Sequence, residues 1–414
     1  MFSIRLLTII LSIFVFLNFN NALPQRAIQR LTTTTKTTTK TTTKPATTNK
    51  PLTKSGSYNL ITSSSGTEPK VWSLTNGQLN YTLSSNPANN DIQKFLVIEN
   101  KYLATFHKNN YLKLWNLHTK TLIATLDSPS TQEDCVIIFP PYKSCARKSL
   151  EYLGKGLLVA SSYKAYSSYS FKIWDLNNNF KLKYEFFRAN GELFFTSSFV
   201  PLADGYLWME GAMMVWDINK KAFINLIIKP DEVAENFISI NQTHFAVIVN
   251  NNANQALLRI YKAANFKSYV REYFVAQLDG LYLIAQMRSM DENYVAVTFG
   301  YSNFSILFIN INNGNKKCFF SSSSHLGFIT SIVSIGSGRF ASGGEDGLIK
   351  IWDANACSLL KTFELGQTIG KLTLIDGAYL ASMTSEFKVW DLNSLTLRYS
   401  FVVGSNVDLG YFKL

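Results

Sequence analysis

The residue types best suited to a chemical site are concentrated in residues 325–360, "HLGFITSIVSIGSGRFASGGEDGLIKIWDANACSLL". This stretch contains His325, Ser342, an Asp-Gly pair that begins at Asp346 and a Trp-Asp pair that begins at Trp352. If the set occurred once, its residue types would suit nucleophilic or acid–base chemistry. If it recurred, it would be a building unit of the fold.

Sequence motifs for catalysis are missing from the chain. It has no G-x-S-x-G, H-E-x-x-H, P-loop or G-x-G-x-x-G motif, and no spacing brings two carboxylates together as an acid–base pair. The four histidines are scattered and no C-x-x-C pair occurs, so no metal site is expected. The sequence therefore predicts a protein that is not an enzyme and that needs no cofactor.

The pattern "IKIWDANACSLL" recurs along the chain, so the opening stretch is a building unit. Two weaker copies are centred on Tyr261 and Ile309, and successive copies lie 38 to 48 residues apart, except for one gap of 59 residues. Six of the seven tryptophans share one position of this repeat: Trp72, Trp115, Trp174, Trp216, Trp352 and Trp390.

Each unit is expected to form four short strands. In the best copy, "ITSIVSI", "RFASGG", "LIKIWD" and "CSLLKTF" alternate apolar and polar residues and are separated by Gly, Asp and Asn turns. At this period the chain resembles a divergent WD40-repeat β-propeller over residues 57–414. The resemblance implies an all-β fold of four-stranded antiparallel blades. Eight repeat positions predict eight blades, and seven is the alternative because two copies are weak.

The two ends of the propeller are expected to share one blade. The first unit begins at "YNLITSS" without an innermost strand, and the last unit is followed by a spare tail, "NVDLGYFKL". Pairing of the tail with the blade of Trp72 would close the ring and remove its exposed edges.

The family resemblance also gives His325, Ser342, Asp346 and Trp352 a structural role. In WD40 repeats the matching residues form a hydrogen-bonded chain that ties the strands of a blade together. No other unit of this sequence carries the complete set.

The N-terminal region is expected to lie outside the propeller. Residues 1–22 combine Arg5 with a mostly apolar run and predict a signal peptide, or an uncleaved signal-anchor as the alternative. Residues 23–56 predict a disordered Thr/Lys/Pro-rich linker or stalk. The chain is therefore expected to be secreted, or tethered to a membrane if the apolar segment is not cleaved.

The net charge of +12 does not predict nucleic-acid binding. Eight of the 40 basic residues fall in residues 1–54, which contain no acid, so the rest of the chain has 32 basic against 28 acidic residues. A nearly balanced globular region lacks the basic stripe that nucleic-acid binding requires.

An insertion at about residues 128–147 should project from the propeller. It contains Cys135 and Cys145, which are expected to form a disulfide after secretion, whereas Cys318 and Cys357 are expected to be free. N-glycosylation sequons occur at Asn80, Asn241 and Asn303, and a tyrosine cluster in a turn between strands is a candidate contact patch: Tyr163, Tyr166 and Tyr169.

Together these patterns predict a monomeric, non-catalytic scaffold that binds a protein or peptide on its rim or at its channel mouth, outside the cytoplasm. A propeller that binds or hydrolyses carbohydrate at the channel mouth is one alternative, and an intracellular WD40 scaffold is another. The fold alone does not select among them.

Overall fold

The structure is a computed structural model of the 414-residue chain, in which residues 51–414 form one compact unit. The predicted signal peptide and the predicted linker lie outside the described residues. The described residues are 58–64, 68–84, 92–107, 111–127, 135–139, 142–145, 147–164, 168–189, 199–202, 205–209, 214–225, 231–241, 243–262, 265–278, 282–291, 293–301, 304–320, 324–402 and 407–413.

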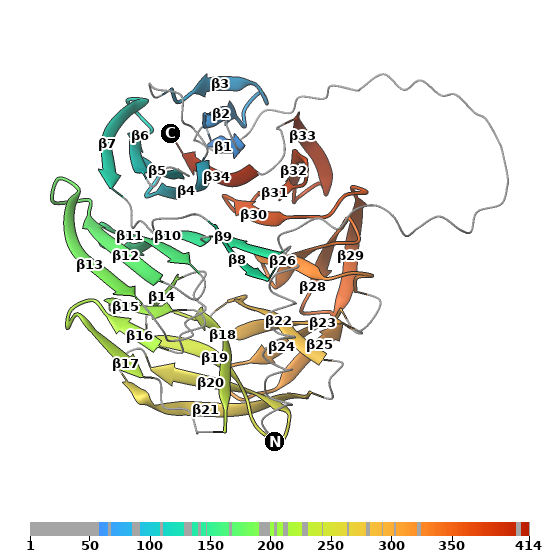
Figure 1. The fold of residues 1–414 in the computed structure, drawn as a ribbon. Coiled ribbons are helices and arrows are strands. Elements are labelled where there is room, and N and C mark those ends of the chain that lie inside the picture. The colour runs from blue at the N-terminus through green and yellow to red at the C-terminus, as the bar shows by residue number, and fades with distance from the viewer. Residues whose placement is uncertain are drawn as a thin grey trace, which may run out of the picture. The chain divides into compact units, whose positions relative to one another are not determined.

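Eight four-stranded antiparallel sheets, the blades, are arranged in a ring (Figure 1). Strands form because β-branched and aromatic residues alternate with polar ones, so that each strand presents an apolar face to a neighbouring blade. From the inner to the outer strand, blades 1 to 4 are β34 (Val407–Lys413), β1 (Tyr58–Ser64), β2 (Lys70–Ser73), β3 (Leu79–Thr82); β4 (Ile92–Ile98), β5 (Tyr102–His107), β6 (Tyr111–Asn116), β7 (Thr121–Asp127); β10 (Arg147–Gly154), β11 (Leu157–Lys164), β12 (Ser168–Asp175), β13 (Lys181–Ala189); and β14 (Phe199–Leu202), β15 (Tyr206–Met209), β16 (Met214–Asp217), β17 (Ala222–Asn225).

The second half of the ring repeats the same order of strands. Blades 5 to 8 are β18 (Val233–Ser239), β19 (His244–Asn250), β20 (Gln255–Lys262), β21 (Asn265–Gln277); β22 (Tyr282–Ser289), β23 (Tyr294–Tyr301), β24 (Ile306–Asn310), β25 (Lys316–Phe320); β26 (Ile329–Gly336), β27 (Arg339–Gly344), β28 (Leu348–Asp353), β29 (Ser358–Glu364); and β30 (Lys371–Ile375), β31 (Tyr379–Met383), β32 (Glu386–Asp391), β33 (Thr396–Val402). The prediction of eight blades is confirmed, and the weak repeats at Tyr261 and Ile309 are the third strands of blades 5 and 6.

The C-terminal strand β34 completes blade 1 by pairing antiparallel with β1, from Tyr58 opposite Lys413 to Ser64 opposite Val407. The inner strands contact one another in the order β34, β4, β10, β14, β18, β22, β26, β30 and back to β34. The ring is thus closed by strands from the two ends of the folded region, as the sequence predicted.

The repeat tryptophan lies on the third strand of its blade and packs against the preceding blade. Trp390 stacks on Phe363 of blade 7 with ring centroids 4.2 Å apart, and Trp352 meets Phe320 of blade 6 at 4.7 Å. Trp72 meets Phe401 of blade 8 at 5.1 Å, so the contact continues across the closure. Because each indole fills the gap between two blades, the apolar core is a series of clusters between neighbouring blades.

The predicted insertion contains a short hairpin, β8 (Cys135–Phe139) and β9 (Tyr142–Cys145), between blades 2 and 3. Since successive strands are antiparallel, this connection lies on the same face of the ring as every turn between the second and third strands of a blade. No helix among the described residues is long and apolar enough to cross a membrane.

Removal of residues 407–414 should unfold the ring cooperatively, because β1 would become an unpaired inner edge. We expect circular dichroism to show loss of the single thermal transition of the full chain. A synthetic peptide of residues 404–414 should restore it, and a truncated chain that melts like the full chain would contradict the closure.

Candidate functional site

The most elaborate polar cluster among the described residues lies in blade 7. Asp346, in the turn between β27 and β28, is 3.0 Å from Nδ1 of His325, whose Nε2 is 2.8 Å from Ser342 Oγ. The indole Nε1–H of Trp352 donates to the same Ser342 oxygen at 2.8 Å, and the backbone N–H of Leu326 donates to Asp346. The four residues therefore form one hydrogen-bonded chain from the connection before β26 to strand β28.

The order serine, histidine, aspartate is that of a catalytic triad, and its distances would suit one. However, Ser342 is fully buried and His325 is 2% exposed, so no substrate can reach the hydroxyl. The serine oxygen also accepts the Trp352 N–H. The cluster thus links the strands of the blade, and its geometry does not offer a nucleophile to a ligand.

Electrostatics favour a neutral histidine and an ionised aspartate in this cluster. Burial lowers the pKa of His325, more than the Asp346 hydrogen bond raises it. Burial alone would raise the pKa of Asp346, but hydrogen bonds from His325 and from the Leu326 N–H lower it below its ordinary value. The carboxylate can therefore remain charged while it orients the imidazole.

Partial versions of the network occur in three other blades. The indole N–H of the repeat tryptophan donates to a hydroxyl on the second strand in blades 1, 2 and 8: Trp72 to Thr62 at 2.8 Å, Trp115 to Thr105 at 3.1 Å, and Trp390 to Ser382 at 3.0 Å. In blade 2 the buried His107 extends this pair, because its Nε2 lies 2.9 Å from Thr105 Oγ1. His107 is not predicted by the repeat pattern, because it lies on the second strand instead of in the connection before the blade.

No family model and no curated protein matches the chain. Solved structures do resemble it: a computationally designed protein, Ika8, is 16% identical, with a TM-score of 0.59 over 81% of this chain and 93% of that one. The C-terminal WD40 domain of Sif2 is 15% identical, with a TM-score of 0.56 over 76% of this chain and 88% of that one. The chain has a WD40-type β-propeller fold.

Blade 5 of the WD40-type propeller replaces the network with a buried ion cluster. Arg259, which is 1% exposed, donates two hydrogen bonds of 2.6 Å to Glu232, just before β18, and one of 2.6 Å to Glu272 on β21. Its guanidinium also lies 4.8 Å from the ring centre of Tyr269. The arginine therefore joins the entry of the blade to its third and outer strands, whereas His325 joins the entry of blade 7 to its second strand and, through Ser342, to its third strand.

The position of Arg259, two residues before the repeat aromatic, is lysine in five blades, a signal that the sequence analysis overlooked. The lysines are Lys70, Lys113, Lys172, Lys350 and Lys388. Lys113 and Lys350 are 8% and 9% exposed, and burial lowers the pKa of both. Their side chains thus occupy space beside the tryptophan instead of forming a basic surface.

Tyrosines on outer strands bind turns of the next blade. The hydroxyls of Tyr81, Tyr273 and Tyr399 donate to the carbonyl oxygens of Leu117, Ile311 and Thr75 at 2.9 to 3.2 Å. Two of these turns contain glycines with positive φ that lie against the tyrosine rings, Gly314 against Tyr273 and Gly77 against Tyr399. A side chain at either glycine would displace the ring, so the turn and the tyrosine are matched.

The expectation that Cys318 and Cys357 are free is wrong, because they form a disulfide between blades 6 and 7. Cys318 lies nine residues after Ile309, as Tyr81 lies nine after Trp72, so the disulfide occupies the place of an inter-blade tyrosine. Cys357 lies in the turn between β28 and β29, the element that such a tyrosine contacts. The 39-residue separation, close to one repeat, could have indicated this pairing.

The other predicted positions are only partly covered by the described residues. Cys135 and Cys145 are direct backbone partners in the β8–β9 hairpin, and their predicted disulfide stays a prediction. Asn80 on β3 and Asn241 in a turn are exposed, whereas Asn303 lies outside the described residues. Two of the clustered tyrosines, Tyr163 and Tyr169, pair as backbone neighbours on β11 and β12; the turn residue between those strands, Tyr166, is not described.

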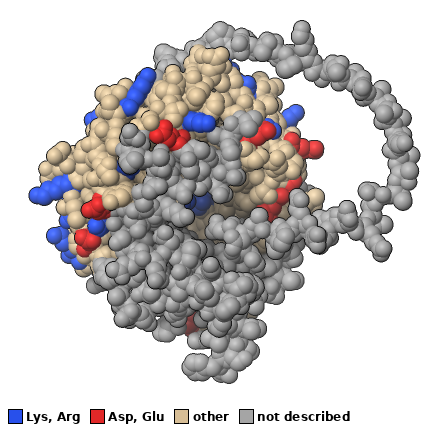
Figure 2. All heavy atoms as spheres, turned by 45° about the horizontal axis from the view of Figure 1, so that its top comes forward, with Lys and Arg blue, Asp and Glu red and all other residues tan. Residues whose placement is uncertain are grey.

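The surface of the described part carries both signs of charge. On the face drawn in Figure 2, Lys and Arg are interspersed with Asp and Glu, and the described residues of this face show no continuous basic stripe. The described residues contain no group of three or more His, Cys, Asp or Glu side chains that could hold a metal ion. The described residues of this face therefore offer no concentrated charge of one sign.

Substitution of Ser342 by alanine should lower the free energy of unfolding by about 2 kcal/mol, because it leaves both His325 and Trp352 without their shared buried partner. Ser382→Ala in blade 8 is the matched control, and it should cost about 1 kcal/mol because Trp390 alone loses its acceptor. Urea denaturation measures both variants. Equal losses would contradict the extended network of blade 7.

The same network should make the protein sensitive to acid. Because the folded-state pKa of His325 lies below its ordinary value of 6.5, the unfolded chain binds more protons below pH 6.5. Stability is therefore full above this pH and falls as the pH decreases through it. His325→Gln should make the free energy of unfolding fall less steeply as the pH decreases below 6.5. Urea denaturation at several pH values measures this dependence. If the variant and the wild type lose stability with the same slope, other titratable groups cause the acid sensitivity.

Loss of the disulfide should destabilise the propeller by about 2–4 kcal/mol, as expected for removal of a native cross-link. The variant carries Cys318→Ser and Cys357→Ser together, so that no free thiol remains at the interface. Guanidinium denaturation with and without dithiothreitol gives the measurement. If reduction leaves the wild-type midpoint unchanged while the cysteines react with a thiol reagent, the bridge contributes no stability.

Proposed function

We propose that this chain is a non-catalytic interaction module that works outside the cytoplasm, either secreted or held at a membrane by its N-terminal segment. Its ligand is a protein or peptide that binds to the rim or channel mouth of the propeller. The proposal rests on the fold, on the sequestered polar network and on the disulfide chemistry of the blades.

The disulfide between Cys318 and Cys357 is the observation that carries the proposed location. Disulfides form and persist in oxidising compartments and are rare in the cytosol. The facing positions of Cys135 and Cys145 fit the same chemistry. The apolar N-terminal segment, with Arg5 ahead of it, would supply the route into that compartment.

Among the described residues, the two polar clusters that resemble reactive sets are closed inside the fold, and this supports a binding role. The serine, histidine and aspartate of blade 7 satisfy one another inside the fold, and the Arg259 cluster of blade 5 is likewise closed by Glu232 and Glu272. What the propeller exposes is a rigid rim made of outer strands and turns. Rigid scaffolds with variable surface loops are suited to recognition of other proteins.

Expression of the full chain in a eukaryotic secretory host tests the location. Intact mass and N-terminal analysis of the medium should find a chain that begins near Leu23, carries glycan mass and has no reactive thiol. A chain with Met1 retained in the membrane fraction would favour the tethered form. A chain in the cytosol with reduced cysteines would overturn the proposed location.

The binding role is tested separately with the purified, folded chain immobilised at low density. Extracellular fractions should yield a protein that binds saturably and that free propeller displaces. A heat-unfolded sample of the same chain is the control. Recovery of no protein ligand that discriminates between the two would contradict the interaction role.

A further inference from the structure

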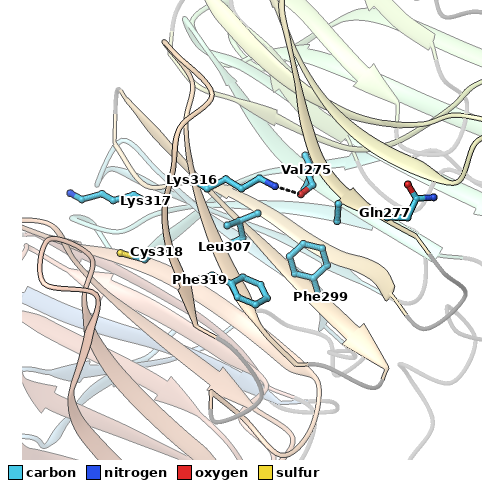
Figure 3. A pocket seen from close by; sticks show the side chains of 9 residues that line it. Val275, Gln277, Phe299, Leu307, Lys316, Lys317, Cys318 and Phe319 are labelled. Atoms are coloured by element: carbon cyan, nitrogen blue, oxygen red, sulfur yellow. Dashed lines mark hydrogen bonds between the residues drawn. The ribbon is translucent and has the colours of Figure 1, made fainter.

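One groove among the described residues lies on the rim, between the outer strand of blade 5 and the face of blade 6 (Figure 3). Its volume is about 560 Å³, which is within the range of ligand-binding clefts. Val275 and Gln277 of β21 form one side, and Phe299, Leu307 and Phe319 form the other. The groove thus lies between two rigid sheets instead of within a loop.

The groove exists because blade 6 lacks the two side chains that fill this gap in other blades. Ile309 stands where six blades have tryptophan, and Leu307 stands where five have lysine. Both are shorter than the residues that they replace, so the outward-widening gap between the blades is incompletely filled. The outer strand β21 adds to this effect, because its register shifts at Val275 and this residue has no partner in the ladder with β20.

The walls of the groove are apolar and partly exposed. Phe299 and Leu307 are 2% and 3% exposed and form its floor. Phe319 on β25 is 55% exposed, and Phe274 on β21 is 48% exposed; among the described residues these are the only phenylalanines exposed to this degree. By contrast, Phe320, which adjoins Phe319 on β25, and Phe363 are covered by the tryptophan of the following blade.

One cation spans the groove. The ammonium of Lys316 donates to the carbonyl oxygen of Val275 at 2.9 Å and lies 5.0 Å from the ring centre of Phe274. No acidic residue lines the groove, and no ion pair among the described residues involves Lys316. An apolar floor beside an ammonium without a carboxylate suits a ligand that brings both an apolar side chain and a negative charge.

We propose that this groove binds an extended segment of a partner protein, in which a large apolar side chain lies next to an aspartate or glutamate. The apolar side chain would rest on Phe299 and Leu307 against Phe319, and the carboxylate would meet Lys316. The chain's own N-terminal segment is a poor occupant, because residues 1–54 carry eight basic residues and no acid. The inference rests on the proposed binding role but not on the proposed location.

Selection of random 12-residue peptides on phage against the full chain tests the groove directly. Enriched peptides should combine an aromatic residue or leucine with an adjacent acid. As fluorescein-labelled synthetic peptides, they should bind Phe319→Ser and Lys316→Glu at least tenfold more weakly than the wild type. Replacement of the peptide acid by lysine should restore binding to Lys316→Glu and weaken binding to the wild type.

Leu397→Ser is the matched control, because Leu397 is 48% exposed on the outer strand of blade 8 and far along the ring from the groove. It should leave peptide affinity unchanged, and thermal melting should show that all three variants remain folded. Peptides that bind all variants equally would overturn the groove while leaving the binding role intact. Failure to enrich any peptide would also overturn the proposed peptide groove. This conclusion holds if the chain is a monomer, and it also holds if two copies form a dimer that Phe319→Ser dissociates.

Discussion

The pairing of β34 with β1 is the constraint on which the rest of this structure depends. Eight sheets in a ring bury their faces against one another only if no blade is left incomplete, and blade 1 has three strands until the C-terminal strand joins it. Once the ring closes, every repeat aromatic has a neighbouring blade to pack on, including Trp72 against Phe401 across the closure. The edge that each inner strand keeps is then short and enclosed by the ring.

The blades share an architecture, but the interactions that hold them differ around the ring. Blade 7 has the full chain from His325 to Trp352, whereas blade 5 ties its entry to its third and outer strands with the buried Arg259 cluster. The disulfide of Cys318 stands where other interfaces use a tyrosine. Where blade 6 has Ile309 and Leu307 the interface is left partly unfilled, and this gap is the groove that we assign to a ligand.

The fold could be predicted from the sequence because it is encoded locally and repeatedly. Each copy of the pattern around Trp352 carries its own alternation and turns, and six of the eight carry the tryptophan. The period therefore gives the number of blades even where Ile309 weakens the signal. The disulfide, the Arg259 cluster and the groove depend instead on which residues of neighbouring blades meet. That register arises from bulges, such as the one at Val275, and no single repeat shows it.

Hydrogen exchange of the full chain, followed by mass spectrometry, tests ring closure most directly. If the ends of the folded region share one blade, the amides of β1 and β34 should exchange as slowly as those of their counterparts in blade 7, the second strand β27 and the inner strand β26, because all four are opened only by global unfolding. Rapid exchange throughout β1 and β34, with protection retained in blade 7, would show an open ring and contradict this structure.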